Sequence, residues 1–300
     1  MLIAGRDAQP IVVKDAQFPE PTTMQARSRM PRVRAESNPQ RVVELSYVVP
    51  ACNSAATIEA TLNTLATTLG GRAVEIVVVE NGSSDGTPEL LSEVRRTWRH
   101  AHVPLVVIDS DKGLGRAYRA GIAASRGGRV VLTADDLPFG FGDLEAADAL
   151  DVAAHPIVIG SKGHRDSVVE RGGLRRLLSA GFWILRRSIL GMRTLDPQGT
   201  FIVAGDWARQ VVGDLTEPGY LVTTELCYLA ERCGIQPVEV PVELSAAHGA
   251  HRSRVKPGDV WRMGAGLVGI RRRHADTRVP RVVVARAAEP VVPIAEVSAA

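Results

Sequence analysis

Two neighbouring carboxylates are the residues of this chain whose type and spacing first suggest chemistry. Asp135 and Asp136 lie in the run ADDLP, directly after a short apolar segment. Adjacent carboxylates repel, and each raises the pKa of the other unless a cation or hydrogen-bond donors offset the charge. A solvated helix N-terminus would explain the pair. A divalent metal ion that holds a diphosphate explains it better, because Mg²⁺ or Mn²⁺ takes oxygen ligands, typically one or two carboxylates with phosphate oxygens.

Two further polar loops also follow apolar segments. PACNS occupies residues 50–54, and ENGSSDGT occupies residues 80–87. The Asn-Gly and Asp-Gly dipeptides of the second loop are typical of turns, so a well-formed loop between a strand and a helix is one interpretation. In the functional interpretation, Glu80 or Asn81 is held at a strand end and forms hydrogen bonds with a nucleotide base or ribose.

The elements that must position these loops alternate between strand and helix. Apolar runs predict strands at residues 42–49, 74–80, 105–109 and 130–133. Apolar side chains at helical spacing from Ile58 to Leu69 predict a helix after the first strand, and Leu114 to Ala124 predicts another before the fourth. Such α/β alternation predicts a mostly parallel sheet with helices on both faces. Ligands bind at the carboxyl ends of such strands, where all three loops fall.

Composition limits the class of protein. The 300 residues are 45% hydrophobic and 23% charged, which is enough apolar material for a sizeable core. A net charge of +3 does not indicate nucleic-acid binding. No long apolar run or signal peptide is evident, so we expect a cytoplasmic protein. The proline-rich residues 1–40 and 276–300 are expected to be disordered or flexible tails.

The order of motifs resembles that of the family 2 glycosyltransferases. The family's VIPAYNE loop is matched by VVPACNS, its VVDDGSTDGT by VVVENGSSDGT, and its DAD strand end by TADD. Later, GSKGHRDS, LDPQGTF, TTELCYLA and HRSRV are similar to segments of dolichyl- and polyprenyl-phosphate glucose and mannose synthases. The resemblance implies a GT-A fold, a Rossmann-like αβα sandwich in a single domain. That domain would span about residues 41–275, with the nucleotide-binding half at about 41–138 and the acceptor half at about 139–275.

The resemblance also assigns site residues. Asp136 becomes the metal ligand, Lys162 replaces the arginine after Gly-Ser, and Arg254 replaces the lysine of a diphosphate-binding loop. Both replacements keep the positive charge, although arginine offers a bidentate fork and lysine a point charge. The implied nucleotide-sugar contacts are Pro50, Ala51, Cys52, Val79, Glu80, Asn81, Lys112, Ala134, Asp135, Asp136, Lys162 and Arg254.

The chain departs from the family pattern at several positions. Ala134 stands where the first aspartate of DAD is usual, so Asp135 is expected to take over the ribose contact. Gly199 and Thr200 stand where Cys-Gly is usual before Phe201, and Thr223 replaces the aspartate of DVELL, which leaves only Glu225 in that motif. Because these last changes lie on the acceptor side, they indicate a changed acceptor or reduced activity.

Basic residues in the acceptor half suggest a lipid surface. Arginine pairs recur eleven residues apart, about three helical turns, beside leucines and isoleucines. One interpretation is a helix that covers the core with a solvated arginine face. The other is peripheral contact with anionic headgroups on the inner face of the membrane. The predicted acceptor or membrane contacts are Arg175, Arg176, Arg186, Arg187 and Arg252.

Three functions remain open at this stage. The preferred hypothesis is inverting transfer of a sugar from a UDP- or GDP-linked donor to a polyprenyl phosphate, in which Asp136 holds the metal and Arg254 and Lys162 assist. A phosphate acceptor needs no base, since its second pKa is about 6. A hydroxyl acceptor on a polysaccharide or specialised metabolite would need one, and Asp196 and Glu225 are the available carboxylates. The third hypothesis is a non-catalytic relative that binds nucleotide sugars.

Overall fold

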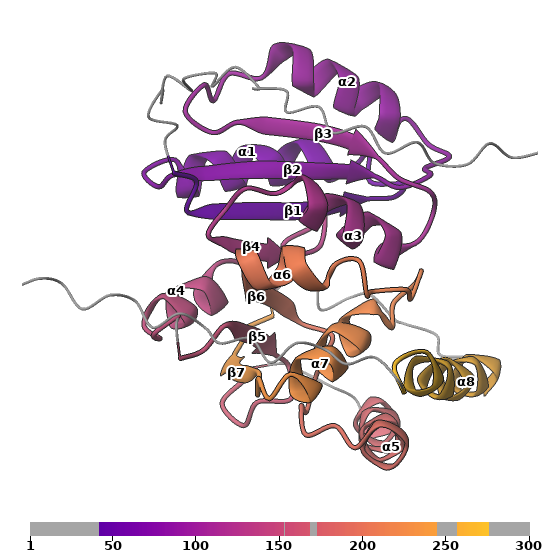
Figure 1. The fold of residues 1–300 in the computed structure, drawn as a ribbon. Coiled ribbons are helices and arrows are strands. Elements are labelled where there is room, and N and C mark those ends of the chain that lie inside the picture. Colours follow the sequence, from indigo (N-terminus) through magenta and orange to yellow (C-terminus); the bar gives the residue numbers. More distant parts are fainter. Residues whose placement is uncertain (1–41, 153, 169–172, 245–256, 276–300) are drawn as a thin grey trace, which may run out of the picture. The chain divides into compact units, whose positions relative to one another are not determined.

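The fold is an α/β arrangement around one seven-stranded sheet (Figure 1). The computed structural model describes residues 42–152, 154–168, 173–244 and 257–275, so the predicted tails lie outside the described residues. The strands are β1 Leu45–Ala51, β2 Val74–Glu80, β3 Leu105–Asp109, β4 Arg129–Leu132, β5 Ile157–Ser161, β6 Thr200–Ala204 and β7 Val238–Pro241. The helices are α1 Ile58–Leu69, α2 Thr87–Thr97, α3 Leu114–Ala124, α4 Gly142–Asp148, α5 Gly173–Leu190, α6 Gly205–Val211, α7 Val222–Arg232 and α8 Pro257–Arg273.

The sheet is mostly parallel, as predicted, with strand order β3-β2-β1-β4-β6-β5-β7. β6 alone runs antiparallel to both of its neighbours, β4 and β5. In the parallel part, Ala51 lies opposite Glu80, and Val48 lies opposite Leu132. This register brings the loops after β1, β2 and β4 to the same edge of the sheet.

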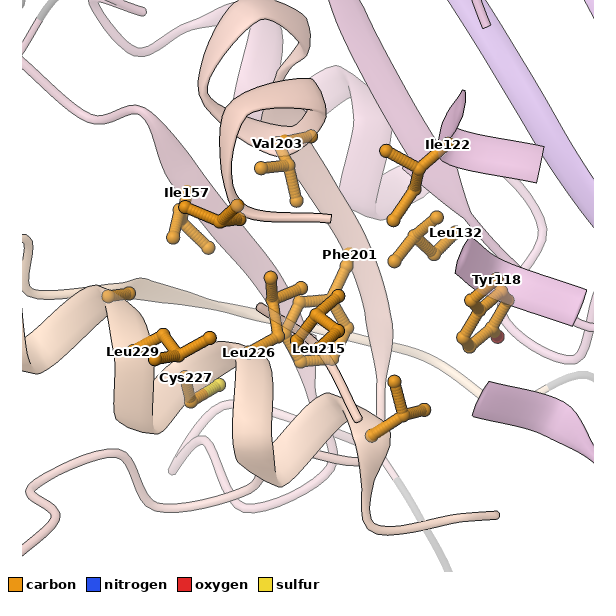
Figure 2. Packing of buried hydrophobic residues seen from close by; sticks show 14 of the residues in the cluster. Tyr118, Ile122, Leu132, Ile157, Phe201, Val203, Leu215, Leu226, Cys227 and Leu229 are labelled. Carbon is orange, nitrogen blue, oxygen red and sulfur yellow. The ribbon is translucent and has the colours of Figure 1, made fainter. Parts of the chain in front are cut away.

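Two apolar cores cover the two faces of the sheet. Along β1, Tyr47 and Val49 pack with α1, α2 and α4, whereas Val48 points to the opposite face and packs with α3, α6 and α7. Figure 2 shows the second core, where Phe201 of β6 lies among Leu215 and Leu226. Each fully buried side chain of this size stabilises the fold by about 1.5–3 kcal/mol. The cores therefore fix the sheet edge that carries the polar loops.

The helices α5 and α8 pack against each other (Figure 1). Gly264 of α8 lies close to Leu185 of α5, where a Cβ atom would be 3.7 Å from Leu185 Cδ2. Within the described ranges, no helix is long and apolar enough to cross a lipid bilayer.

Candidate active site

A pocket of about 810 Å³ lies at the carboxyl ends of β1, β2 and β4. Pro50 of β1, Asn81 after β2, and Asp135 and Asp136 after β4 all line it. Lys162, which follows β5, also lines it. The three polar loops identified in the sequence therefore meet at one edge of the sheet, as the rule for parallel strands predicts.

The carboxylate of Asp135 is half-buried and held by its neighbours. The Ser54 hydroxyl donates a short hydrogen bond to Asp135 Oδ2, and the Thr61 hydroxyl donates to the Asp135 carbonyl oxygen at 2.6 Å. Burial raises the pKa of Asp135, the Ser54 hydrogen bond opposes this rise, and the charge of Asp136 adds to it. A cation beside the two carboxylates would offset both the energetic cost of burying their charge and the repulsion between them.

The acid pair also suits a metal ion that is shared with a ligand. Among the described residues, no group of three histidine, cysteine or acidic side chains could hold a metal by itself. Asp135 and Asp136 offer two carboxylates, so a hard divalent cation would take its other ligands from water and diphosphate oxygens. These two residues therefore fit the kind of metal site that the sequence predicts.

The polar side chains of the loop after β2 form hydrogen bonds mainly with nearby backbone groups. Asn81 is 3% exposed, and its amide donates to the Gly113 carbonyl at 2.8 Å and accepts from the Gly113 N–H at 3.2 Å. Glu80 accepts hydrogen bonds from the N–H groups of Gly82 and Ser83. Burial raises the pKa of Glu80, but these hydrogen bonds outweigh it and the pKa is lowered. Asn81 lines the pocket and fixes the turn beside Lys112, whereas Glu80 does not line it.

The other predicted nucleotide contacts divide into two groups. The side chains of Ala51 and Val79 are fully buried in the two cores, so neither side chain can touch a ligand in this structure. The second group lines the pocket as predicted: Pro50, Cys52, Lys112 and Ala134.

Lys162 and Asp196 both form hydrogen bonds with Gln198. Lys162 Nζ donates to the Gln198 carbonyl at 3.0 Å and lies 5.6 Å from the centre of the Phe139 ring. Asp196 Oδ1 accepts from the Gln198 N–H at 3.2 Å, and the Asp196 N–H donates to Glu239 at 2.9 Å. Both residues line the pocket, while the roles of Lys162 as a nucleotide-sugar contact and of Asp196 as a catalytic carboxylate stay predictions.

The assignment of Arg186 to an exposed membrane-facing stripe is wrong. Arg186 is only 2% exposed, and its guanidinium donates to the carbonyls of Thr194 and Leu195 at 3.1 and 2.6 Å. It lines the pocket and lies 5.2 Å from the centre of the Phe182 ring. Burial lowers the pKa of Arg186, and its Nε atom has no hydrogen-bond partner. The helix turns this arginine inward because the turn at 194–195 offers it two carbonyls.

The assignment of Glu225 as an available base is also wrong. Glu225 is fully buried and is not among the residues that line the pocket. Its carboxylate accepts hydrogen bonds from Thr216, the Glu217 N–H and His274. A carboxylate surrounded by donors and shielded from the pocket cannot take a proton from an acceptor.

Of the remaining predicted basic contacts, the structure describes the side chain of Arg187 alone. Arg252 and Arg254 lie outside the described residues, and so do the side chains of Arg175 and Arg176. Arg187 is exposed, with its guanidinium 5.8 Å from the centre of the Trp183 ring.

Sequence reasoning missed the two hydroxyls that hold Asp135. Ser54 lies within the PACNS loop, so its position after the first strand was a usable signal. Thr61 lies in α1, and only the packing of that helix brings its hydroxyl to the end of β4.

Comparison with known proteins finds similar sequences and a similar solved structure. The chain is 25% identical over 262 residues to the dolichyl-phosphate beta-glucosyltransferase of Dictyostelium discoideum, which covers 82% of this chain and 79% of the relative. It is 27% identical over 252 residues to the Homo sapiens protein of the same name, covering 77% and 76%. The fold is shared with glucosyl-3-phosphoglycerate synthase from Mycobacterium tuberculosis, solved with uridine diphosphate, at a TM-score of 0.51, 23% identity, and 77% and 80% coverage.

The family itself is shown by a match to a family model over most of the described sheet. Residues 46–212 match the model of glycosyl transferase family 2, from β1 to the end of α6. This region covers more than half of the chain and contains the acid pair, Lys162 and Asp196. The chain therefore belongs to the family 2 glycosyltransferases and is an enzyme with the GT-A fold.

Proposed function

We propose that this enzyme transfers one sugar, with inversion, from a nucleoside-diphosphate sugar to a polyprenyl phosphate of the dolichyl type. The supporting observation is that one pocket joins the acid pair Asp135 and Asp136 to the cations Lys162 and Arg186. The relatives from Dictyostelium discoideum and Homo sapiens are named dolichyl-phosphate beta-glucosyltransferases. Their names favour this acceptor and make glucose the first sugar to test.

On the donor side, the acid pair is assigned to the binding of the nucleoside diphosphate. Asp136 is the proposed ligand of Mg²⁺ or Mn²⁺, which when bound neutralises the charge that develops on the departing diphosphate. Asp135, fixed by Ser54, is left to accept a hydrogen bond from the ribose. Lys112 at the rim adds positive charge near the phosphates. Arg254 is proposed for the same role, although it lies outside the described residues.

On the acceptor side, the buried charge of Arg186 favours an anionic group. Burial lowers the pKa of Arg186, and the nearby charges of Asp196, Glu239 and Glu231 only partly offset this effect. Burial of a charge is costly, so an anion bound beside Arg186 and Lys162 would stabilise the arginine further. Leu195 and Tyr220, which are 50% and 78% exposed, line the same pocket and offer apolar surface to a lipid chain.

The reaction that follows needs no protein base. An oxygen of the acceptor phosphate attacks the anomeric carbon, and a new carbon–oxygen bond forms as the bond to the diphosphate oxygen breaks. The acceptor phosphate is largely ionised at neutral pH, since its second pKa is about 6. Asp196 is then proposed to orient the acceptor or sugar hydroxyls, because its carboxylate lines the pocket.

Residues 41–275 are proposed as the catalytic domain, with peripheral contact to the inner face of the membrane. Arg187 and Ile184 support this contact, because both are exposed on α5, one charged and one apolar. Exposed basic side chains near an anionic surface each contribute about 1 kcal/mol of binding.

Donor binding is tested by thermal-shift measurements with UDP-glucose, GDP-mannose and CDP-glucose, with and without Mn²⁺. Ligand binding raises the melting temperature by mass action, so one nucleotide should give a metal-dependent shift. Asp136→Asn should abolish that metal dependence. Asp206→Asn is the matched control, because Asp206 is exposed on α6 and pairs with Arg209 outside the pocket. Metal-dependent binding that survives in Asp136→Asn would contradict the assigned metal ligand.

Acceptor choice is tested by offering polyprenyl phosphate and polyprenol to the same enzyme. We expect transfer only to the phosphate, and Asp196→Asn should retain measurable turnover because no base is needed. Transfer to polyprenol that Asp196→Asn abolishes would overturn the phosphate acceptor in favour of a hydroxyl acceptor.

A further inference from the structure

Helix α8 ends against the buried carboxylate of Glu225. His274 follows α8 and is 3% exposed, with its Nε2 atom 2.8 Å from Glu225 Oε1. Because a carboxylate only accepts hydrogen bonds, Nε2 must carry the proton in this contact. Two arginines reinforce the junction: Arg232 donates to the His274 carbonyl, and Arg273 pairs with Glu217 at 2.5 Å.

The same carboxylate holds a segment that precedes α7. Glu225 Oε2 accepts from the N–H groups of Thr216 and Glu217 at 2.9 and 2.8 Å. Glu225 Oε1 accepts from the Thr216 hydroxyl at 2.8 Å, besides its contact with His274. Hydrogen bonds to an ionised acceptor are about twice as strong as neutral ones. Glu225 therefore joins the end of α8 to residues 216–217.

This segment packs directly on the start of α3. The Gly115 N–H donates to the Pro218 carbonyl at 3.0 Å. A Cβ atom on Gly115 would lie 1.9 Å from the Glu217 carbonyl oxygen, and one on Gly113 would lie 2.3 Å from that of Pro218. The backbones are thus in contact, so a shift of residues 217–218 would displace the turn before α3.

Both sides of this contact belong to the pocket. Gly219 and Tyr220 follow the held segment and line the pocket wall, and Lys112 and Gly113 line it on the side of α3. None of the four hydrogen bonds to Glu225 involves a pocket-lining residue, so the carboxylate acts from behind the wall.

We infer that Glu225 and His274 are positioning residues, which fix residues 216–220 and the turn at Lys112 and so make α8 part of the framework of the donor site. The inference deepens the proposed function and rests on it for the choice of donor in the kinetic test. Releasing His274 would leave Glu225 with one donor fewer and allow the segment to move. Because the moving parts line the donor pocket, binding suffers more than turnover.

Amide hydrogen exchange on the ligand-free protein tests the coupling without any assumption about the donor. In His274→Ala we expect exchange at Thr216, Glu217 and Gly115 to become at least about tenfold faster. Arg272→Ala is the matched control, because Arg272 is an exposed neighbour on the same helix and should leave those amides unchanged. Faster exchange confined to the last turn of α8 would overturn the inference.

Steady-state kinetics provide the second readout. His274→Ala should raise KM for the donor sugar about tenfold and leave kcat within about twofold, since misplacement of binding groups costs affinity first. His274→Gln keeps a side-chain N–H that reaches toward Glu225, so it should restore most of the loss. Unchanged KM in His274→Ala, with the wild type active, would contradict the inference. If the wild type shows no donor binding, the proposed function fails, while the exchange experiment still decides this proposal.

A folding control keeps the test decisive. Circular dichroism and a cooperative unfolding transition establish that each variant is folded. If His274→Ala does not fold, Thr216→Val replaces it in both measurements, because that change removes only the hydroxyl that donates to Glu225. The same faster exchange at Gly115 is expected, and its absence would count against the coupling.

Discussion

Replacing Gly115 with alanine would drive a methyl group into the backbone behind the pocket wall. The new Cβ atom would lie 1.9 Å from the Glu217 carbonyl oxygen and 3.0 Å from the carbonyl carbons of Glu217 and Pro218. Ordinary van der Waals contact begins at about 3.4 Å, so residues 217–218 must withdraw by about 1.5 Å. Glu225 resists this movement because it holds Thr216 and Glu217 by three hydrogen bonds.

The cost of the substitution can be worked from these contacts. Loss of the hydrogen bond from the Gly115 N–H to Pro218 costs about 1 kcal/mol. Overpacking of a well-filled site costs about 1–3 kcal/mol. Alanine regains up to about 1 kcal/mol over glycine in a helix. The expected net loss is therefore about 1–3 kcal/mol in the free energy of unfolding, and each kcal/mol lowers Tm by about 2–4 °C in a domain of this size.

Urea denaturation of the two alanine variants Gly115→Ala and Gly181→Ala measures how each change alters the free energy of unfolding. Gly181 is also helical, in α5, but a Cβ atom there meets nothing within 4 Å. Gly181→Ala should therefore gain up to about 1 kcal/mol of stability from helix propensity alone. If Gly115→Ala were as stable as the wild type, the packing of residues 217–218 on α3 would be refuted, and with it the basis for coupling α8 to the pocket.

Three further changes test separate parts of the structure. Asp135→Asn should stabilise the ligand-free protein at pH 7, because burial and the charge of Asp136 raise the pKa of Asp135 in the folded state. Because the folded pKa is raised, ionisation of Asp135 lowers the free energy of unfolding of the wild type as pH rises above the unfolded pKa of about 4. Urea titrations at pH 4 and 7 should therefore show Asp135→Asn to be more stable than the wild type only at pH 7. Glu75→Gln should cost about 2 kcal/mol in urea denaturation, since the buried Glu75 carboxylate accepts three hydrogen bonds from Arg126, and a loss below about 0.5 kcal/mol would contradict this. Arg186→Lys keeps the charge but loses the fork, so KM for polyprenyl phosphate should rise about fivefold with donor KM unchanged, and equal changes in both would count against an acceptor role.

The parts of the fold that local periodicity determines were predictable from the sequence. Val74–Glu80, Leu105–Asp109 and Leu114–Ala124 have the predicted bounds. The first strand begins at Leu45 and not at Val42, which is 84% exposed outside the sheet, because apolar character alone does not establish strand pairing. The direction of β6 could not be predicted either, since the connections before and after a strand set its direction, and its side chains do not.

The site was predictable as far as it depends on strand ends. Asp135 and Asp136 lie where the carboxyl-end rule places them, in one pocket with Asn81. The membrane contact of Arg186 and the role of Glu225 as a base were wrongly predicted, because the burial of a charged residue depends on its partners. For Glu225 the decisive partner, His274, is 49 residues away in the sequence. Spacing along a helix cannot reveal a contact of that kind.

Two of the departures from the family pattern, Gly199 and Thr223, have packing explanations. These explanations change what the two departures imply about the acceptor. A Cβ atom on Gly199 would lie 1.7 Å from the Gly160 carbonyl oxygen, so glycine is required where β6 approaches β5. Thr223 is buried at the start of α7 and does not line the pocket. Neither residue therefore removes a charge from the pocket. Among the described residues that line the pocket, the cations of Lys162 and Arg186 lie with the carboxylate of Asp196, and this balance favours an anionic acceptor whether or not Gly199 and Thr223 match the family pattern.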